Sequence, residues 1–172
     1  VFGWELGGLE TGADRSIDDV PFAEITRLLC AAYGRGAVNT VSWHPQNPES
    51  GASAWDGKTS TAVSSILPGG ANHAQFRLWL DRLAGFFVGL KSADGTCVPV
   101  LFRPFHEHTG NGFWWGKGNC TAEEYIALWR FTLEYLRDTK GVHNLLYVYS
   151  PDIVSSQDNY LEFWPGDAYV DV

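Results

Sequence analysis

Apolar runs of strand length alternate with segments of helical periodicity, and this alternation constrains the fold of the chain more than any other feature. The runs expected to be strands cover residues 1–6, 38–43, 98–105 and 145–149, with a last strand expected at Tyr169. The segments expected to be helices cover residues 21–34, 72–90, 121–136 and 160–163. Strands that are apolar throughout and separated by helices are typical of a parallel sheet in an α/β fold.

Two architectures fit such a sheet: the open doubly wound fold and the (β/α)8 TIM barrel. A doubly wound nucleotide-binding fold needs a G-x-G-x-x-G turn after its first strand, and the early glycines do not have that spacing. Polar residues follow several predicted strands, which is the arrangement of a barrel's active-site face. A whole barrel takes about 250 residues. We therefore expect residues 1–172 to form one incomplete barrel domain, with no second domain.

The charge balance excludes several classes of partner. There are 12 Lys and Arg against 20 Asp and Glu, a net charge of −8, which argues against nucleic acid and against a polybasic membrane surface. No stretch approaches the roughly 20 apolar residues of a membrane span. Aromatic residues make up 15% of the chain and include 8 Trp, which favours stacking on sugars or, alternatively, an aromatic-rich core. Because the chain has no Met and begins at Val1, we expect a removed leader or a piece of a longer protein.

The sequence predicts no metal site. His106-Glu107 begins like H-E-x-x-H, but Gly110 stands where the second histidine belongs. His106 and His108 should also lie on opposite faces of an extended chain. The cysteines form no C-x-x-C pair, and both a single disulfide and three free thiols stay open. They are widely spaced: Cys30, Cys97 and Cys120.

The strongest candidate for chemistry is Glu107, in the run RPFHEHTG at 103–110 that precedes FWWG at 113–116. A carboxyl at the end of a buried strand, beside a histidine and aromatic rings, is expected to be desolvated, which raises its pKa toward that of a general acid. Arg103 should share a face with Glu107 and would lower that pKa if close. The alternative is a salt-bridged structural glutamate.

Other polar or aromatic residues follow predicted strands. His44 could bind a sugar hydroxyl or be a structural histidine, and Trp55 in the next loop could be a sugar platform or a loop anchor. Glu5 and Asp152 also stand at strand ends and are candidate partner carboxylates.

A set of motifs runs in order along nearly the whole chain. They are SWHP at 42–45, ILPGG at 66–70, LFRPFHE at 101–107, FWWG at 113–116, NLLYVYSPD at 144–152 and PGD at 165–167. Together they resemble glycoside hydrolase family 26, best known for endo-β-1,4-mannanases. The resemblance implies a (β/α)8 barrel that hydrolyses with retention, and the chain would cover about strands two to six.

The resemblance also implies roles for individual residues. Glu107 would be the acid/base, His106 would lie beside the cleaved sugar, and His44 would hydrogen-bond that sugar. Phe113 and Trp115 would wall the cleft. The family's nucleophile, a glutamate after strand seven, would lie outside this chain, and no cofactor is implied. One departure is Gly112, where family members commonly carry an aromatic residue.

We therefore expect an extracellular, periplasmic or cell-surface retaining endo-β-1,4-mannanase acting on mannan, galactomannan or glucomannan. Residues 1–172 alone should be inactive for lack of the nucleophile. Two alternatives stay open. One is a β-1,3-xylanase or mixed-linkage β-glucanase of the same family, and the other is a non-catalytic carbohydrate-binding barrel.

Overall fold

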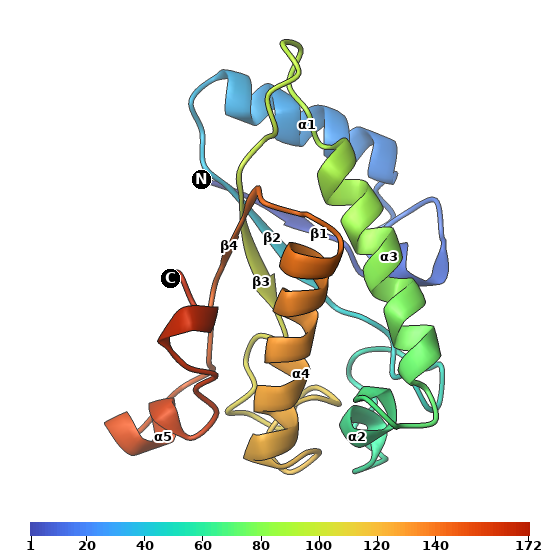
Figure 1. Cartoon of the computed structure of the whole chain (residues 1–172), viewed down its shortest axis with the longest axis vertical. Helices are drawn as coiled ribbons and strands as arrows, with labels where there is room; N and C mark the ends of the chain where they lie inside the picture. The colour runs from blue at the N-terminus through green and yellow to red at the C-terminus, as the bar shows by residue number, and fades with distance from the viewer.

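A computed structural model describes residues 1–172 and contains one parallel sheet with the strand order β1-β2-β3-β4 (Figure 1). The strands are β1 Phe2–Glu5, β2 Asn39–Trp43, β3 Val100–Pro104 and β4 Leu145–Tyr147. In the register of the sheet, Val41 lies beside Phe102, and Phe102 lies beside Tyr147. The first four predicted strands and their parallel order are therefore confirmed, each somewhat shorter than the apolar run that predicted it.

Three long helices connect successive strands and lie on one side of the sheet (Figure 1). They are α1 Phe22–Gly34, α3 His73–Gly89 and α4 Ala122–Glu134. The shorter elements are η1 Leu9–Thr11, α2 Ala62–Ile66, the π-helical turn η2 Tyr135–Thr139 that continues α4, α5 Gln157–Leu161 and η3 Asp167–Tyr169. No helix combines the length and the apolar composition needed to cross a membrane.

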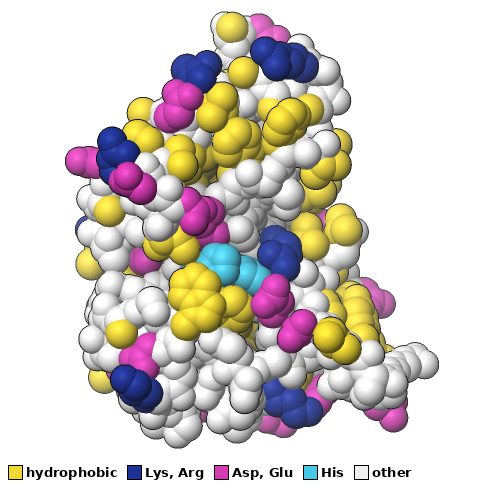
Figure 2. All heavy atoms as spheres, turned by 180° about the vertical axis from the view of Figure 1, so that it is seen from behind, with side chains coloured by type: hydrophobic (Ala, Val, Ile, Leu, Met, Phe, Trp, Pro, Cys, Tyr) yellow, Lys and Arg dark blue, Asp and Glu magenta, His cyan; other side chains and the backbone are white.

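The two faces of the sheet differ in composition because side chains alternate along each strand. The helix-covered face is apolar and buried: Val41, Trp43, Phe102, Leu145 and Tyr147. The opposite face carries smaller and more polar side chains and borders a cavity. Its residues beside the cavity are Gly3, Glu5, Thr40, Ser42 and Arg103. Figure 2 looks onto this uncovered face, which is hollowed near its centre. In a closed barrel such a face points inward.

The prediction of a strand at Tyr169 is wrong, because Tyr169 is the last residue of the 3-10 turn η3. The backbone becomes extended only at Val170. The amide of Asp171 then donates to the Tyr147 carbonyl at 2.9 Å, and the amide of Tyr149 donates to the Val172 carbonyl at 2.9 Å. Pairing along β4 therefore begins after the turn.

The N-termini of α4 and α3 differ in how they are capped. The Thr121 hydroxyl accepts the Glu124 amide at 3.2 Å, and the Glu124 carboxylate accepts the Thr121 amide at 2.9 Å, so the T-x-x-E spacing forms a capping box on α4. Asn72 precedes α3, but its side chain does not cap that helix and donates to the Ser65 hydroxyl at 3.2 Å instead.

The three cysteines are free thiols, so no disulfide links them in this structure. Cys97 is exposed, whereas Cys120 is partly buried beneath the loop that follows β3. Burial raises the pKa of the Cys120 thiol to about 12, with a smaller contribution from Glu124. Cys120 is therefore an unreactive thiol at neutral pH.

Candidate active site

A cavity of about 800 Å³ lies over the uncovered face of the sheet and reaches the carboxyl ends of β1, β2 and β3. Glu5, His44, Trp55 and Arg103 line it at that end. In Figure 2, histidine, basic, acidic and apolar side chains meet at the centre of this face. The carboxyl ends of parallel strands are where a (β/α)8 barrel carries its active site.

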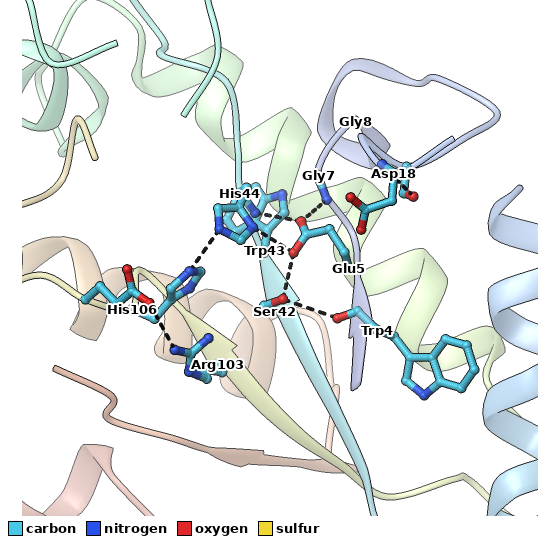
Figure 3. Close-up of polar contacts among 12 residues, drawn as sticks. Trp4, Glu5, Gly7, Gly8, Asp18, Ser42, Trp43, His44, Arg103 and His106 are labelled. Atoms are coloured by element: carbon cyan, nitrogen blue, oxygen red, sulfur yellow. Dashed lines mark hydrogen bonds and ion pairs between the residues drawn. The ribbon is translucent and has the colours of Figure 1, made fainter. Parts of the chain in front are cut away.

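Glu5 is the most heavily bonded carboxylate of this region (Figure 3). It accepts hydrogen bonds from the Ser42 hydroxyl at 2.6 Å and from the His44 amide at 2.9 Å, and it also accepts the Gly7 amide. Its Oε2 lies 2.7 Å from Nδ1 of His44. Burial would raise the pKa of Glu5, but the bonds from His44, Ser42 and Gly7 outweigh it and lower the pKa. Glu5 is therefore an ionised group that orients His44.

The His44 ring extends this chain to a second imidazole, since its Nε2 lies 2.9 Å from Nε2 of His106 (Figure 3). Burial, with smaller contributions from the charges of Arg103 and His44, lowers the pKa of His106 to about 3. His106 is therefore neutral, and only one proton can lie between the two Nε2 atoms. The Nδ1 atom of His106 is buried without a partner. The ring nitrogens of the pair are thus bonded to Glu5, bonded to each other or buried, so a ligand reaches an Nε2 atom only by replacing the hydrogen bond between the two rings.

Glu107 lies at the rim of this region, beyond the end of β3 at Pro104. Its side chain is 47% exposed, so the prediction that the Glu107 carboxyl is desolvated is wrong. The reason is local: Phe105 and Glu107 have positive φ angles of 46° and 57°, and this turn carries the carboxylate out of the aromatic cluster. The Arg103 guanidinium lies 3.8 Å from the Glu107 carboxylate, so the two side chains share a side of the strand as expected.

Arg103 is held in turn by the strand next to it. Its Nε donates to the Ser150 hydroxyl at 2.7 Å, and the Ser150 carbonyl accepts the Glu107 amide at 2.7 Å. Ser150 therefore fixes both the cation and the backbone of the carboxylate that faces it. Sequence analysis missed Ser150 and also Ser42, although alternation along β2 puts Ser42 on the same side as His44.

Two of the aromatic residues expected to wall the cleft lie in the core. Trp115 is 0% exposed, and its indole N–H donates to the His106 carbonyl at 2.9 Å. Its ring stacks on Phe113 with 4.6 Å between the ring centroids and 8° between the ring planes. Phe113 is also buried and packs edge-on against His106 at 5.2 Å. The expectation that Trp115 walls the cleft is therefore wrong, because its polar atom is satisfied by the main chain beneath the site.

Trp55 is instead an exposed aromatic residue that lines the cavity. It is 56% exposed and stacks on the His44 ring, with 5.1 Å between the ring centroids and 14° between the ring planes. A large exposed ring held flat by a second ring is suited to stacking on a sugar. Gly112 is exposed, and a Cβ at that position would meet open space, so a side chain would fit there without a clash.

Asp152 follows β4 and is exposed. Its amide donates to the Thr109 hydroxyl at 2.9 Å, and its carboxylate lies against Gly110, where a Cβ would be 2.9 Å from Oδ2. No hydrogen bond joins this carboxylate to Glu107 or Arg103. No group of three His, Cys, Asp or Glu side chains is arranged to hold a metal ion.

Comparison with known proteins identifies the family. The family model described as glycosyl hydrolase family 26 matches residues 15–172. A mannan endo-1,4-β-mannosidase of Bifidobacterium adolescentis is 41% identical over the whole chain, which spans 18% of that protein. Endoglucanase H of Acetivibrio thermocellus is 35% identical over 87% of the chain, which aligns with 15% of that protein.

Solved structures extend the likeness to three dimensions. The GH26 β-mannanase from Bacteroides ovatus superposes on 98% of the chain with a TM-score of 0.95 and 44% identity. The chain spans 49% of that structure, so it corresponds to about half of the solved protein. The predicted incomplete (β/α)8 barrel is confirmed by this match and by the four parallel strands. The chain therefore belongs to glycosyl hydrolase family 26.

Proposed function

We propose that the protein containing this chain is a secreted, periplasmic or cell-surface retaining endo-β-1,4-mannanase in which Glu107 is the acid/base. The observation that carries the assignment is the state of the two glutamates at the carboxyl ends of β1 and β3, Glu5 and Glu107. Glu5 is saturated by donors from its own chain, whereas the Glu107 side chain is half exposed, accepts no hydrogen bond and has an ion-pair contact with Arg103 at 3.8 Å. Of these two glutamates, only Glu107 has a carboxylate that is free to meet a substrate, and it follows His106 directly in the chain. The similarity to mannan endo-1,4-β-mannosidases supports mannan as the substrate.

The chemistry divides between two carboxyl groups. Glu107 protonates the departing glycosidic oxygen and then, as the carboxylate, takes a proton from the attacking water. A retaining site needs a nucleophilic carboxylate about 5–5.5 Å away. Glu5 is unsuited because donors occupy both of its oxygens, so this proposal places the nucleophile outside residues 1–172. His44 and His106 bind the sugar at the point of cleavage once a sugar hydroxyl takes the place of the hydrogen bond between their Nε2 atoms. Trp55 stacks on a neighbouring sugar.

The test uses the full-length protein and the Glu107→Gln variant. Loss of the proton donor should reduce kcat/KM on β-1,4-mannan by about 10²- to 10⁴-fold, and far less on a dinitrophenyl β-mannoside, whose leaving group needs no protonation. Glu24→Gln is the matched control, because Glu24 is also an exposed glutamate paired with an arginine, but on helix α1. An equal loss on both substrates would remove Glu107 from the acid role. NMR of the first-formed product should show the β-anomer.

A second candidate is hydrolysis of mixed-linkage β-glucan, supported by the likeness to Endoglucanase H; β-1,3-xylan is a further substrate to assay beside it. Reducing-sugar release from mannan, mixed-linkage glucan and β-1,3-xylan by the same preparation decides among the substrates. Tight binding of a polysaccharide with no release of reducing sugar would instead favour a non-catalytic carbohydrate-binding barrel.

A further inference from the structure

The turn that carries Glu107 has an unusual backbone. Phe105 and Glu107, on either side of His106, both have left-handed φ angles, of 46° and 57°. Residues with a side chain adopt this region at a cost, and bulky ones rarely. Two such residues within three positions persist only when surrounding groups hold them.

Three hydrogen bonds from different parts of the fold hold the turn. The Phe105 carbonyl accepts the Tyr125 hydroxyl at 2.9 Å, and the His106 carbonyl accepts the Trp115 indole N–H at 2.9 Å. The Glu107 amide donates to Ser150 at 2.7 Å. Trp115 lies in the loop after β3 and is a large core residue. Tyr125 is the contact whose polar atom can be removed with the least change in volume.

Tyr125 has a second partner that closes a loop around Glu107. Its hydroxyl lies 2.9 Å from Nδ1 of His108, the residue that follows Glu107. The single hydroxyl proton goes to the Phe105 carbonyl, which can only accept. Nδ1 of His108 must therefore carry the proton and donate to the Tyr125 oxygen. The buried Tyr125 hydroxyl therefore hydrogen-bonds both Phe105 and His108, which lie on either side of Glu107 in the chain.

The His108 ring is fixed in this state by its surroundings. It is fully buried, and burial lowers its pKa to about 3, so it is neutral at working pH. Its ring packs at 4.4 Å on Tyr125 and at 4.5 Å on Tyr149. Its Nε2 is buried without a partner, so the Nδ1–H bond to Tyr125 is its only side-chain hydrogen bond.

We propose that Tyr125 is a positioning residue for Glu107, acting through the His108–Tyr125–Phe105 hydrogen-bond chain, a role that rests on the function proposed above. Without the hydroxyl, the Phe105 carbonyl and the His108 N–H lose their partner in a dry environment, and the left-handed turn relaxes. The carboxylate then moves away from the place of the glycosidic oxygen. Misplacement of a reacting group by about 1 Å can cost on the order of 100-fold in rate.

The test is Tyr125→Phe in the full-length enzyme, assayed by kcat/KM on a β-1,4-manno-oligosaccharide and on a dinitrophenyl β-mannoside. We expect a loss of roughly 10- to 100-fold on the oligosaccharide, mainly in kcat, because proton donation depends on where the carboxylate stands. The activated substrate should lose less than about threefold, because its leaving group needs no proton. This dependence on the leaving group distinguishes positioning of the acid from a general loss of structure.

Tyr149→Phe is the matched control. Tyr149 is also buried and packs on His108, but its hydroxyl donates to the Tyr160 carbonyl at 2.8 Å, away from the turn. It should lower Tm about as much as Tyr125→Phe and leave the ratio of the two kcat/KM values unchanged. His108→Asn, which retains an N–H near Nδ1, should keep more activity on the oligosaccharide than His108→Leu.

Equal losses on both substrates, or no loss, for a folded Tyr125→Phe enzyme would overturn the proposal. If that variant does not fold, the His108→Asn and His108→Leu pair decides, and equal activities of the two would overturn it. Glu107→Gln run in parallel separates the two claims. If Glu107→Gln shows the leaving-group dependence and Tyr125→Phe does not, the positioning role fails alone. If Glu107→Gln itself lacks that dependence, the proposed function fails.

Discussion

At the scale of single residues, Glu5 organises the imidazole side of the cavity. Its folded-state pKa lies below the ordinary 4.5, so its charge stabilises the fold above that pH, and this contribution is lost as the pH falls through the lowered value. We therefore expect Glu5→Gln to lower Tm near neutral pH and the difference from wild type to shrink below about pH 4.5. Thermal melts of the full-length protein across that range measure it. A difference that stays constant with pH would mean that the charge of Glu5 contributes no stability.

Two tryptophans of the site region differ in the role that the structure gives them. Trp55→Ala should weaken oligosaccharide binding by about 1 kcal/mol, roughly fivefold, with little change in Tm, because its ring is largely exposed and packs on His44 and Phe113 from one side of the cavity. Trp115→Ala should instead cost about 3–5 kcal/mol of folding free energy, because its ring is fully buried. Titration calorimetry and thermal melts on both variants separate the two effects. A stable Trp115→Ala protein that binds sugar weakly would restore Trp115 to the cleft.

At the scale of elements, the N-terminus of α4 matters because Tyr125 lies in its first turn. Thr121→Ala removes the capping hydroxyl and should destabilise the protein by about 1 kcal/mol. Asn72→Ala before α3 should cost less, because the Asn72 side chain bonds Ser65 and leaves the helix amides uncapped. Denaturant unfolding of the two variants compares them directly. An equal cost at both positions would contradict the capping assignment.

The regular elements were predictable because apolar periodicity reports which face of a strand or helix is buried. The loop at 106–119 has no apolar periodicity, so the sequence does not distinguish a buried Trp115 from a cleft residue. For the same reason the sequence supports two roles for Trp55, a sugar platform and a loop anchor. The left-handed backbone angle at Glu107 could not be predicted either, because glycine is the residue type that usually marks a positive φ in a sequence. Strand order therefore predicted the place of the site, while the exposure of its side chains had to come from the structure.

At the scale of the whole molecule, the sheet is covered on one side only. The helix side holds the core, and the other side borders the cavity and carries both polar residues and Leu146, which is 45% exposed. Strand β1 pairs only with β2, and Phe2 on it is 48% exposed. Unpaired strand edges and exposed apolar side chains favour association with another chain.

Residues 1–172 expressed alone should therefore self-associate and show no mannanase activity. Activity needs two carboxylates flanking the scissile bond, and of the glutamates at the carboxyl ends of β1 and β3, Glu5 is fully bonded while Glu107 is free. Light scattering after gel filtration measures association, and a reducing-sugar assay on mannan, with a Glu107→Gln control, measures activity. If residues 1–172 released sugar and the control did not, a nucleophile would lie within them. Asp152, the exposed carboxylate beside Gly110, would then be the residue to replace first.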